Sequence, residues 1–140
     1  MGTEERRDDA GPVRELRVAL TVDDFDAALA FYRDALGLAQ VADWSSPDGR
    51  VVVLAAGRAT LELLDERQAE YIDEVEVGTR VAGHVRVALE VDDSAATLGV
   101  LERAGAEPIA GPVVTPWKDR NVRLHAPDGL QLTLFTVLER

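Results

Sequence analysis

The stretch RVALTVDD (residues 17–24) returns as RVALEVDD (residues 86–93), so seven of its eight positions are identical. Each copy alternates Val or Leu with polar or small residues, which is typical of a half-buried strand. Each copy ends in an aspartate pair, and aspartate is a preferred N-cap residue of helices. An internal repeat of this kind predicts a single domain built from two similar strand-helix halves.

Working outward from the first copy, turn residues and apolar periodicity divide the first half into short elements. The pattern predicts a helix over about 24–36, whose apolar side chains recur at helical spacing and which Gly37 ends. Pro47-Asp48-Gly49 and Gly57 provide turns between strands. The expected strands are 14–22, 38–44, 51–55 and 59–64, which makes the first half β-α-β-β-β.

The second copy starts the same pattern again after a linker over 67–82, in which we expect a short helix near 67–72. A helix is expected over 94–104, and strands over 85–91, 109–115, 120–125 and 130–137. The predicted fold class is therefore α+β, with two tandem βαβββ modules forming a cupped mixed sheet. Residues 14–140 form this domain, with module one over 14–66 and module two over 83–138.

The composition indicates a globular protein whose partner is a small molecule or another protein. The 140-residue chain has 15 basic and 26 acidic residues, a net charge of −11, and no cysteine. Such a surface repels phosphate backbones and anionic lipids, so we expect neither a nucleic acid nor a membrane as partner. The lack of cysteine excludes disulfides and thiolate metal sites.

The N-terminal segment over 1–13 is rich in charged residues and has no long apolar run. This composition predicts a disordered charged tail instead of a signal peptide. A cytoplasmic location is the resulting expectation.

The strand alternation also predicts a polar face on each sheet. If one set of side chains packs against the helices, the other set must share the opposite face. In the first strand Leu16, Val18, Leu20 and Val22 would face the helix. The opposite face would carry Arg17, Glu62, His84, Arg86, Asn121, Arg123, His125, Gln131, Thr133 and Phe135, among others. If the two sheets curl toward each other, this face lines a cavity.

These features together resemble the vicinal oxygen chelate superfamily, which includes glyoxalase I, extradiol dioxygenases and bleomycin-resistance binding proteins. The resemblance extends over nearly all of 13–138. It depends on the strand that ends in Val-Asp-Asp, the following AALAFYRDALGL segment (27–38), ATLEL (59–63) and the Pro127-Asp128-Gly129 turn. It implies the cupped fold but leaves function open, because one scaffold hosts many chemistries.

Enzymes of this family usually hold a divalent metal through four side chains, which the resemblance assigns to Arg17, Glu62, Arg86 and Thr133. Arginine is protonated and offers no lone pair, so these residues predict a protein without a metal or other cofactor. A two-residue slip of both first strands is the alternative. It would place Glu15, Glu62 and His84 together, a set suited to zinc, manganese or iron(II).

Arg17 and Arg86 are expected to approach each other across the pseudo-twofold axis, near Glu62. Two like charges need an anion between them. Either Glu62 neutralises them in a structural network, or the two guanidinium groups clamp a carboxylate, phenolate or phosphate of a ligand. Both interpretations remain open at this point.

The remaining candidates concern the pocket wall and proton transfer. Glu62 and His84 are the candidate catalytic residues if the protein is an enzyme. The predicted ligand-binding residues are Arg17, Trp44, Glu62, Arg86, Trp117, Arg123, Thr133 and Phe135, since aromatic walls with scattered polar groups suit planar ligands. We expect the acidic residues over 66–76 to form a solvated surface.

The leading functional prediction is a metal-independent binding protein that sequesters an antibiotic or another partly aromatic metabolite, as in antibiotic resistance. We also expect a homodimer, because the open cup and its sheet edges need covering. The alternatives are a lyase, isomerase, cyclase or dioxygenase-like enzyme, and a structural or regulatory subunit with a collapsed cup.

Overall fold

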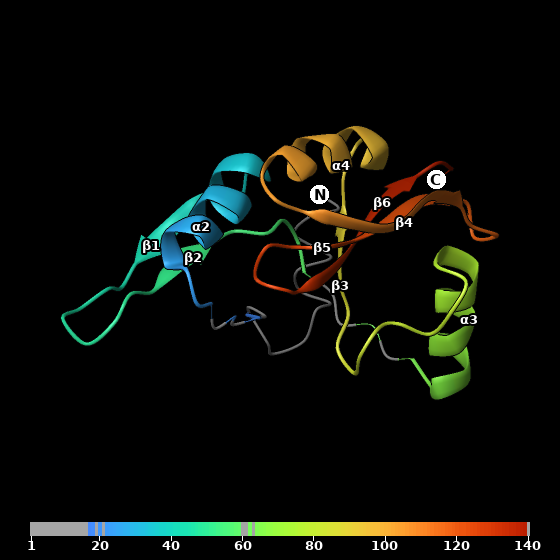
Figure 1. The fold of residues 1–140 in the computed structure, drawn as a ribbon, viewed down its shortest axis with the longest axis horizontal. Coiled ribbons are helices and arrows are strands. Elements are labelled where there is room, and N and C mark those ends of the chain that lie inside the picture. Colours follow the sequence, from blue (N-terminus) through green and yellow to red (C-terminus); the bar gives the residue numbers. More distant parts are fainter. Residues whose placement is uncertain (1–16, 19, 21, 60–61, 63, 140) are drawn as a thin grey trace, which may run out of the picture.

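The second half of the chain forms the main sheet of the computed structural model, which describes residues 17–18, 20, 22–59, 62 and 64–139. Its strands are β3 (Val87–Glu90), β4 (Glu107–Val114), β5 (Asp119–His125) and β6 (Gln131–Val137). They are ordered β3-β6-β5-β4, with β3 parallel to β6 and the other pairs antiparallel (Figure 1). With α4 (Ser94–Arg103) between β3 and β4, this half has the predicted β-α-β-β-β order.

The first half contributes a helix and a separate two-stranded hairpin. The helix begins as α2 (Phe25–Leu29) and continues without a break as the π-helix η1 (Ala30–Ala35). β1 (Gln40–Asp43) and β2 (Val52–Leu54) pair antiparallel, where strands over 38–44 and 51–55 are predicted.

Two other strands expected in this half have no counterpart among the described residues. Residues 17–18, 20 and 22 of the first, and residues 59, 62 and 64 of the last, lie outside any strand. The rest of these two segments, and the expected tail over 1–13, lie outside the described residues. The α+β class and the vicinal oxygen chelate architecture are nevertheless evident in the βαβββ half and the helix-hairpin half.

Both aspartate pairs start helices as predicted. The carboxylate of Asp24 accepts a hydrogen bond from the Ala27 N–H, and that of Asp93 accepts one from the Ala96 N–H, each at 3.0 Å. Each bond satisfies one of the amide groups that a first helical turn leaves unpaired. The repeated motif therefore has the same local role in both halves.

The hydrophobic core lies between α4 and one face of the main sheet. Leu98 and Leu101 of α4 are buried with four sheet residues, Val122, Leu124, Leu132 and Leu134. Phe31 of η1 is buried in the same cluster. The sequence pattern predicts an inner face formed by Phe25, Ala28, Leu29, Tyr32 and Leu36. The buried residue of this helix is instead Phe31, three positions after Ala28.

Val18 and Leu20 of the first repeat do not join this core. Val18 and Leu20 are 59% and 40% exposed, so the prediction that they pack against the helix is wrong for these two residues. Neither residue lies in a strand of the described part, and a strand's inner face is buried only where the sheet forms.

Helix α3 (Glu66–Glu76) lies on the other side of the main sheet from α4 (Figure 1). It begins after the Asp65 N-cap and is longer than the short helix expected in the linker, near 67–72. Across the ranges that the structure describes, no helix is long and apolar enough to span a membrane.

The close approach of β4 and β5 at Gly111 gives a test of this sheet. Gly111 has φ +101°, and a Cβ there would lie 2.6 Å from the carbonyl oxygen of Asn121. We expect Gly111→Ala to lower the free energy of unfolding by more than about 1 kcal/mol. Gly99→Ala, in α4 with open space around it, should raise it by about 0.5–1 kcal/mol. Urea unfolding of both variants measures this, and equal effects would contradict the described β4–β5 packing.

Candidate functional site

The face of the main sheet opposite α4 is polar, as the strand alternation predicts. Along β5, Asn121 and Arg123 alternate with the core residues Val122 and Leu124. Arg123 is 2% exposed and Asn121 is 5% exposed, which is unusual for such polar residues. A buried guanidinium requires an anionic partner, so the site is built around the group that Arg123 binds.

That partner is α3, which brings two carboxylates to the polar face. The Glu76 carboxylate accepts hydrogen bonds from Arg123 Nη2 at 2.8 Å and from Asn121 Nδ2 at 2.7 Å. Oδ1 of Asp73 accepts from Arg123 Nη1 at 3.1 Å and from Arg86 Nη1 at 2.7 Å. Asp73 and Glu76 are both buried, so the expectation that residues 66–76 form only a solvated surface is wrong.

The second oxygen of Asp73 holds the loop that follows α3. Its Oδ2 accepts from the backbone N–H groups of Val81 and Ala82, each at 2.9 Å. Burial by itself would raise the pKa of this carboxyl, but these two N–H groups, Arg86 and Arg123 together hold the pKa of Asp73 at about 2. Asp73 is therefore a carboxylate near neutral pH.

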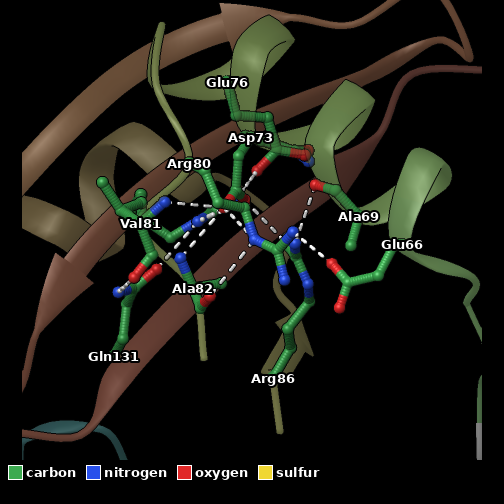
Figure 2. Close-up of polar contacts among 11 residues, drawn as sticks. Glu66, Ala69, Asp73, Glu76, Arg80, Val81, Ala82, Arg86 and Gln131 are labelled. Atoms are coloured by element: carbon green, nitrogen blue, oxygen red, sulfur yellow. Dashed lines mark hydrogen bonds and ion pairs between the residues drawn. The ribbon is translucent and has the colours of Figure 1, made fainter. Parts of the chain in front are cut away.

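Four further contacts surround this pair of carboxylates (Figure 2). Arg80 binds Glu66 at 2.7 Å and lies 3.6 Å from Asp73. Arg86 Nη2 donates to the carbonyl of Ala69 at 2.9 Å. Gln131 Nε2 donates to the carbonyl of Val81 at 3.2 Å. The helix is thus attached to the sheet through charged and amide groups.

The expected network of Arg17, Glu62 and Arg86 is not what the structure contains. The counter-ion of Arg86 is Asp73. Arg17 lies over the ring of Trp44, 4.9 Å from its centroid, in a cation–π arrangement. Glu62 is exposed. Glu62 is the carboxylate expected near Arg86, whereas the carboxylate that pairs with it comes from the linker.

The other predicted residues have different surroundings. Trp117 is partly exposed, and its ring centroid lies 6.1 Å from that of Tyr71 on α3. Thr133 and Phe135 are half-buried on β6, where they pair in register with Arg123 and Asn121. His84 is exposed in the segment between α3 and β3. Of the predicted set, Arg86, Trp117, Arg123, Thr133 and Phe135 thus lie on or next to the β5–β6 face.

The residues at the four ligand positions do not fit the divalent metal that the family resemblance implies. Two are guanidinium groups, which donate hydrogen bonds and cannot coordinate a cation. Of the alternative set, Glu15 lies outside the described residues, whereas Glu62 and His84 are exposed. Within the described ranges, no three His, Cys, Asp or Glu side chains gather in a way that could hold a metal ion.

Sequence reasoning missed Asp73 and Glu76, although the sequence does contain a signal for them. Ala69, Asp73 and Glu76 are the buried residues of α3, and they fall at i, i+4 and i+7. This spacing forms one stripe of a helix. The stripe is easily overlooked because two of its members are acidic, and acidic stripes normally face water.

The clefts in the described part of the chain include the following two. One, of about 170 Å³, lies between α2 and the 127–129 turn and is lined by Asp24, Ala27 and Pro127, among others. Nearby, the Tyr32 hydroxyl donates to Asp128 at 2.8 Å, and burial followed by this bond raises the pKa of Tyr32. The other cleft, of about 410 Å³, is an open one beside Asp65 and Tyr71. Neither is lined by Arg86 or Arg123, because α3 covers the polar face there.

The chain is similar to known proteins both in its family and in its structure. The family model described as Glyoxalase/Bleomycin resistance protein/Dioxygenase superfamily matches residues 16–134. A search of curated proteins found no match.

Three solved structures illustrate the similarity. A glyoxalase/bleomycin resistance protein from Streptomyces sp. CB03234 is 26% identical with a TM-score of 0.52, over 82% of this chain and 93% of that chain. A superfamily member from Sphaerobacter thermophilus DSM 20745 is 25% identical with a TM-score of 0.55, over 86% and 99%. TnmS3, an antibiotic binding protein from Streptomyces sp. CB03234, is 23% identical with a TM-score of 0.54, over 88% and 99%.

The low pKa of Asp73 predicts an acid-sensitive part of the stability. A carboxyl whose folded-state pKa lies below its ordinary value of 3.8 stabilises the fold above about pH 4, and this contribution is lost as the pH falls toward 2. The shift corresponds to roughly 2–3 kcal/mol. We expect Asp73→Asn to be less stable than wild type at pH 7 and to approach it near pH 2.5.

Urea unfolding at several pH values measures this difference. Glu74→Gln is the matched control, because Glu74 is exposed on the same helix and its removal should change the free energy of unfolding by less than about 0.5 kcal/mol. A difference in the free energy of unfolding between wild type and Asp73→Asn that stays constant from pH 7 to 2.5 would contradict the assigned ion pairs.

Proposed function

The chain belongs to the Glyoxalase/Bleomycin resistance protein/Dioxygenase superfamily, and from that premise we propose that it binds a small molecule without a metal ion. The ligand is an antibiotic or another partly aromatic metabolite, which the protein sequesters and does not transform. The polar face of the main sheet, with Arg86, Arg123 and Asn121, is the binding surface.

The observation that carries this proposal is the buried arginine at the centre of the polar face. Arg123 is 2% exposed on a strand whose other face packs in the core. A guanidinium is a fixed cation with a planar fork of donors, which suits recognition of an anionic group. It is a poor general base and cannot ligate a metal, so a binding role uses its chemistry better than catalysis does.

The comparison with TnmS3 supports the antibiotic class of ligand. TnmS3 is an antibiotic binding protein, and its fold covers 88% of this chain. The same scaffold thus accommodates antibiotic binding in another protein. The aromatic ring of Trp117, which lies beside the polar face, offers the planar surface that a partly aromatic ligand needs.

An enzyme that uses Glu62 and His84 is the alternative, as a lyase, isomerase or cyclase. Both side chains are exposed. A general base is more effective where water is excluded and the reacting group is held at hydrogen-bond distance. The buried charges of this site lie instead on Asp73, Glu76 and Arg123.

A screen of aromatic carboxylic acids and of antibiotics that contain aromatic rings, followed by tryptophan fluorescence, tests binding. We expect saturable quenching that is unchanged by EDTA, with the ligand recovered intact by mass spectrometry. Elemental analysis that finds about one zinc, iron or manganese ion per chain would contradict metal independence. Conversion of the bound compound into a product would favour the enzyme.

We further propose that the protein is a homodimer through the first half of the chain. Val18, Leu20, Val41 and Trp44 are exposed large apolar or aromatic residues in that half. Covering such residues is a common reason for twofold pairing. Light scattering at micromolar concentration should give twice the chain mass of 15.2 kDa. Val41→Glu should shift the mass toward that of a monomer, and a monomeric wild type would contradict the proposal.

A further inference from the structure

We propose that the polar face binds an organic molecule with two carboxylate groups. When this molecule is absent, the carboxylates of Asp73 and Glu76 of α3 occupy its place and act as an internal ligand. This inference rests on the proposed binding function and adds the class of ligand. It also assigns α3 a role, because the helix must move off the polar face when the dicarboxylate binds.

The direction of the hydrogen bonds across the interface supports an exchange of this kind. Arg123 and Asn121 on β5, Arg86 just before β3, and Gln131 on β6 provide the donors. The acceptors all belong to α3 and its following loop: the carboxylates of Asp73 and Glu76 and the carbonyls of Ala69 and Val81. A ligand that brings carboxylate oxygens can therefore replace the two side chains group for group.

The helix and its loop can leave the sheet as one body. Oδ2 of Asp73 is bound within this unit, to the N–H groups of Val81 and Ala82. The ion pair of Arg80 with Glu66 at 2.7 Å also lies within it. Only Oδ1 of Asp73 faces the arginines of the sheet. Departure of α3 thus breaks the contacts to the sheet and leaves the internal contacts of the unit in place.

The core cluster does not extend to α3 in the described part of the chain. It contains no residue of this helix, and Tyr71 is 45% exposed. The buried residues of the helix are Ala69, Asp73 and Glu76. Burying paired charges removes water from both ions, and this cost cancels much of their attraction. Docking of α3 should therefore be weak enough for a ligand to compete.

The arginines that remain on the sheet after α3 leaves would favour an anion with more than one acidic group. Helix α3 carries five acidic residues and one basic residue, so its departure removes negative charge from this face. Arg86 and Arg123 then present two guanidinium groups beside the amide of Asn121. Because these groups now bind two separate carboxylates, one helical turn apart, the structure assigns them to a dicarboxylate.

The internal carboxylates also leave part of the site unsatisfied. Among the described residues, Nε of Arg123 and Oδ1 of Asn121 are buried without a hydrogen-bond partner. Such orphaned polar groups cost free energy in a closed structure. A free ligand is not restrained by a helix backbone, so it can orient a carboxylate toward Nε and a donor group toward Oδ1.

The test uses succinate as the probe and Trp117 as the reporter. Trp44→Phe leaves Trp117 as the single tryptophan, and its neighbour Tyr71 moves away when α3 leaves. In this background, Asp73→Asn with Glu76→Gln removes the internal ligand but keeps the size of both side chains. Glu70→Gln with Glu74→Gln is the matched control, because it removes two exposed acidic groups from the same helix. Succinamide is the uncharged control compound.

We expect the Asp73→Asn, Glu76→Gln protein to bind succinate at least about tenfold more tightly than the control variant, because the competing closed state is depopulated. Succinamide should bind to neither. Equal succinate affinity of the two variants, or equal affinity for succinate and succinamide, would overturn the proposal.

Wild-type protein provides a second measurement that does not depend on the variants folding. Rising succinate should speed amide hydrogen exchange over residues 66–76 and leave exchange over 94–103 unchanged, with sodium chloride at matched ionic strength as the control. Exchange over 66–76 that is unchanged, or that chloride speeds equally, would contradict displacement of α3. A neutral metabolite that binds without affecting α3 would refute this inference alone, whereas the binding function would stand.

Discussion

One oxygen atom of Asp73 accepts hydrogen bonds from two arginines, Arg86 and Arg123. Whether α3 covers the polar face of the main sheet depends on this interaction. Arg123 lies on a central strand whose neighbouring residues are committed to the core, so its guanidinium cannot turn away from the face that it occupies. A fixed cation in a buried place needs an anion. The chain provides that anion from a helix outside the repeat, and α3 is held where it is for this reason.

The two faces of the main sheet are consequently stabilised in different ways. On one face, Leu98 and Leu101 of α4 bury apolar surface against the leucines of β5 and β6, an interaction that persists over a wide range of pH and salt. On the other, α3 is attached through ion pairs and amide hydrogen bonds, which acid and competing anions weaken. Apolar packing on one face and charged contacts on the other thus involve the same strands, and adjacent residues of β5 take part in each of them.

The site also shows how a scaffold associated with metal binding can instead present groups that bind an anion. The resemblance implies ligands at four positions, of which two are Arg17 and Arg86. A metal-ligating side chain donates a lone pair to a cation. An arginine at the same position instead donates hydrogen bonds to an anion, so the site favours the opposite charge. The consequence extends beyond the positions themselves, because Arg86 draws Asp73 and the whole of α3 toward the sheet.

The sequence by itself determined the elements whose signal is local. The repeated strand followed by an aspartate cap predicted both helix starts, the βαβββ order of the second half, and the alternation that places Arg123 opposite Leu124. These features follow from side-chain period and capping, which act within a few residues. Only the tertiary structure decided which carboxylate meets Arg86 and that Val18 and Leu20 stay exposed. Asp73 and Arg123 are 50 positions apart in the sequence. An acidic helix predicts a solvated surface, and only the fold shows that a buried cation lies beside it.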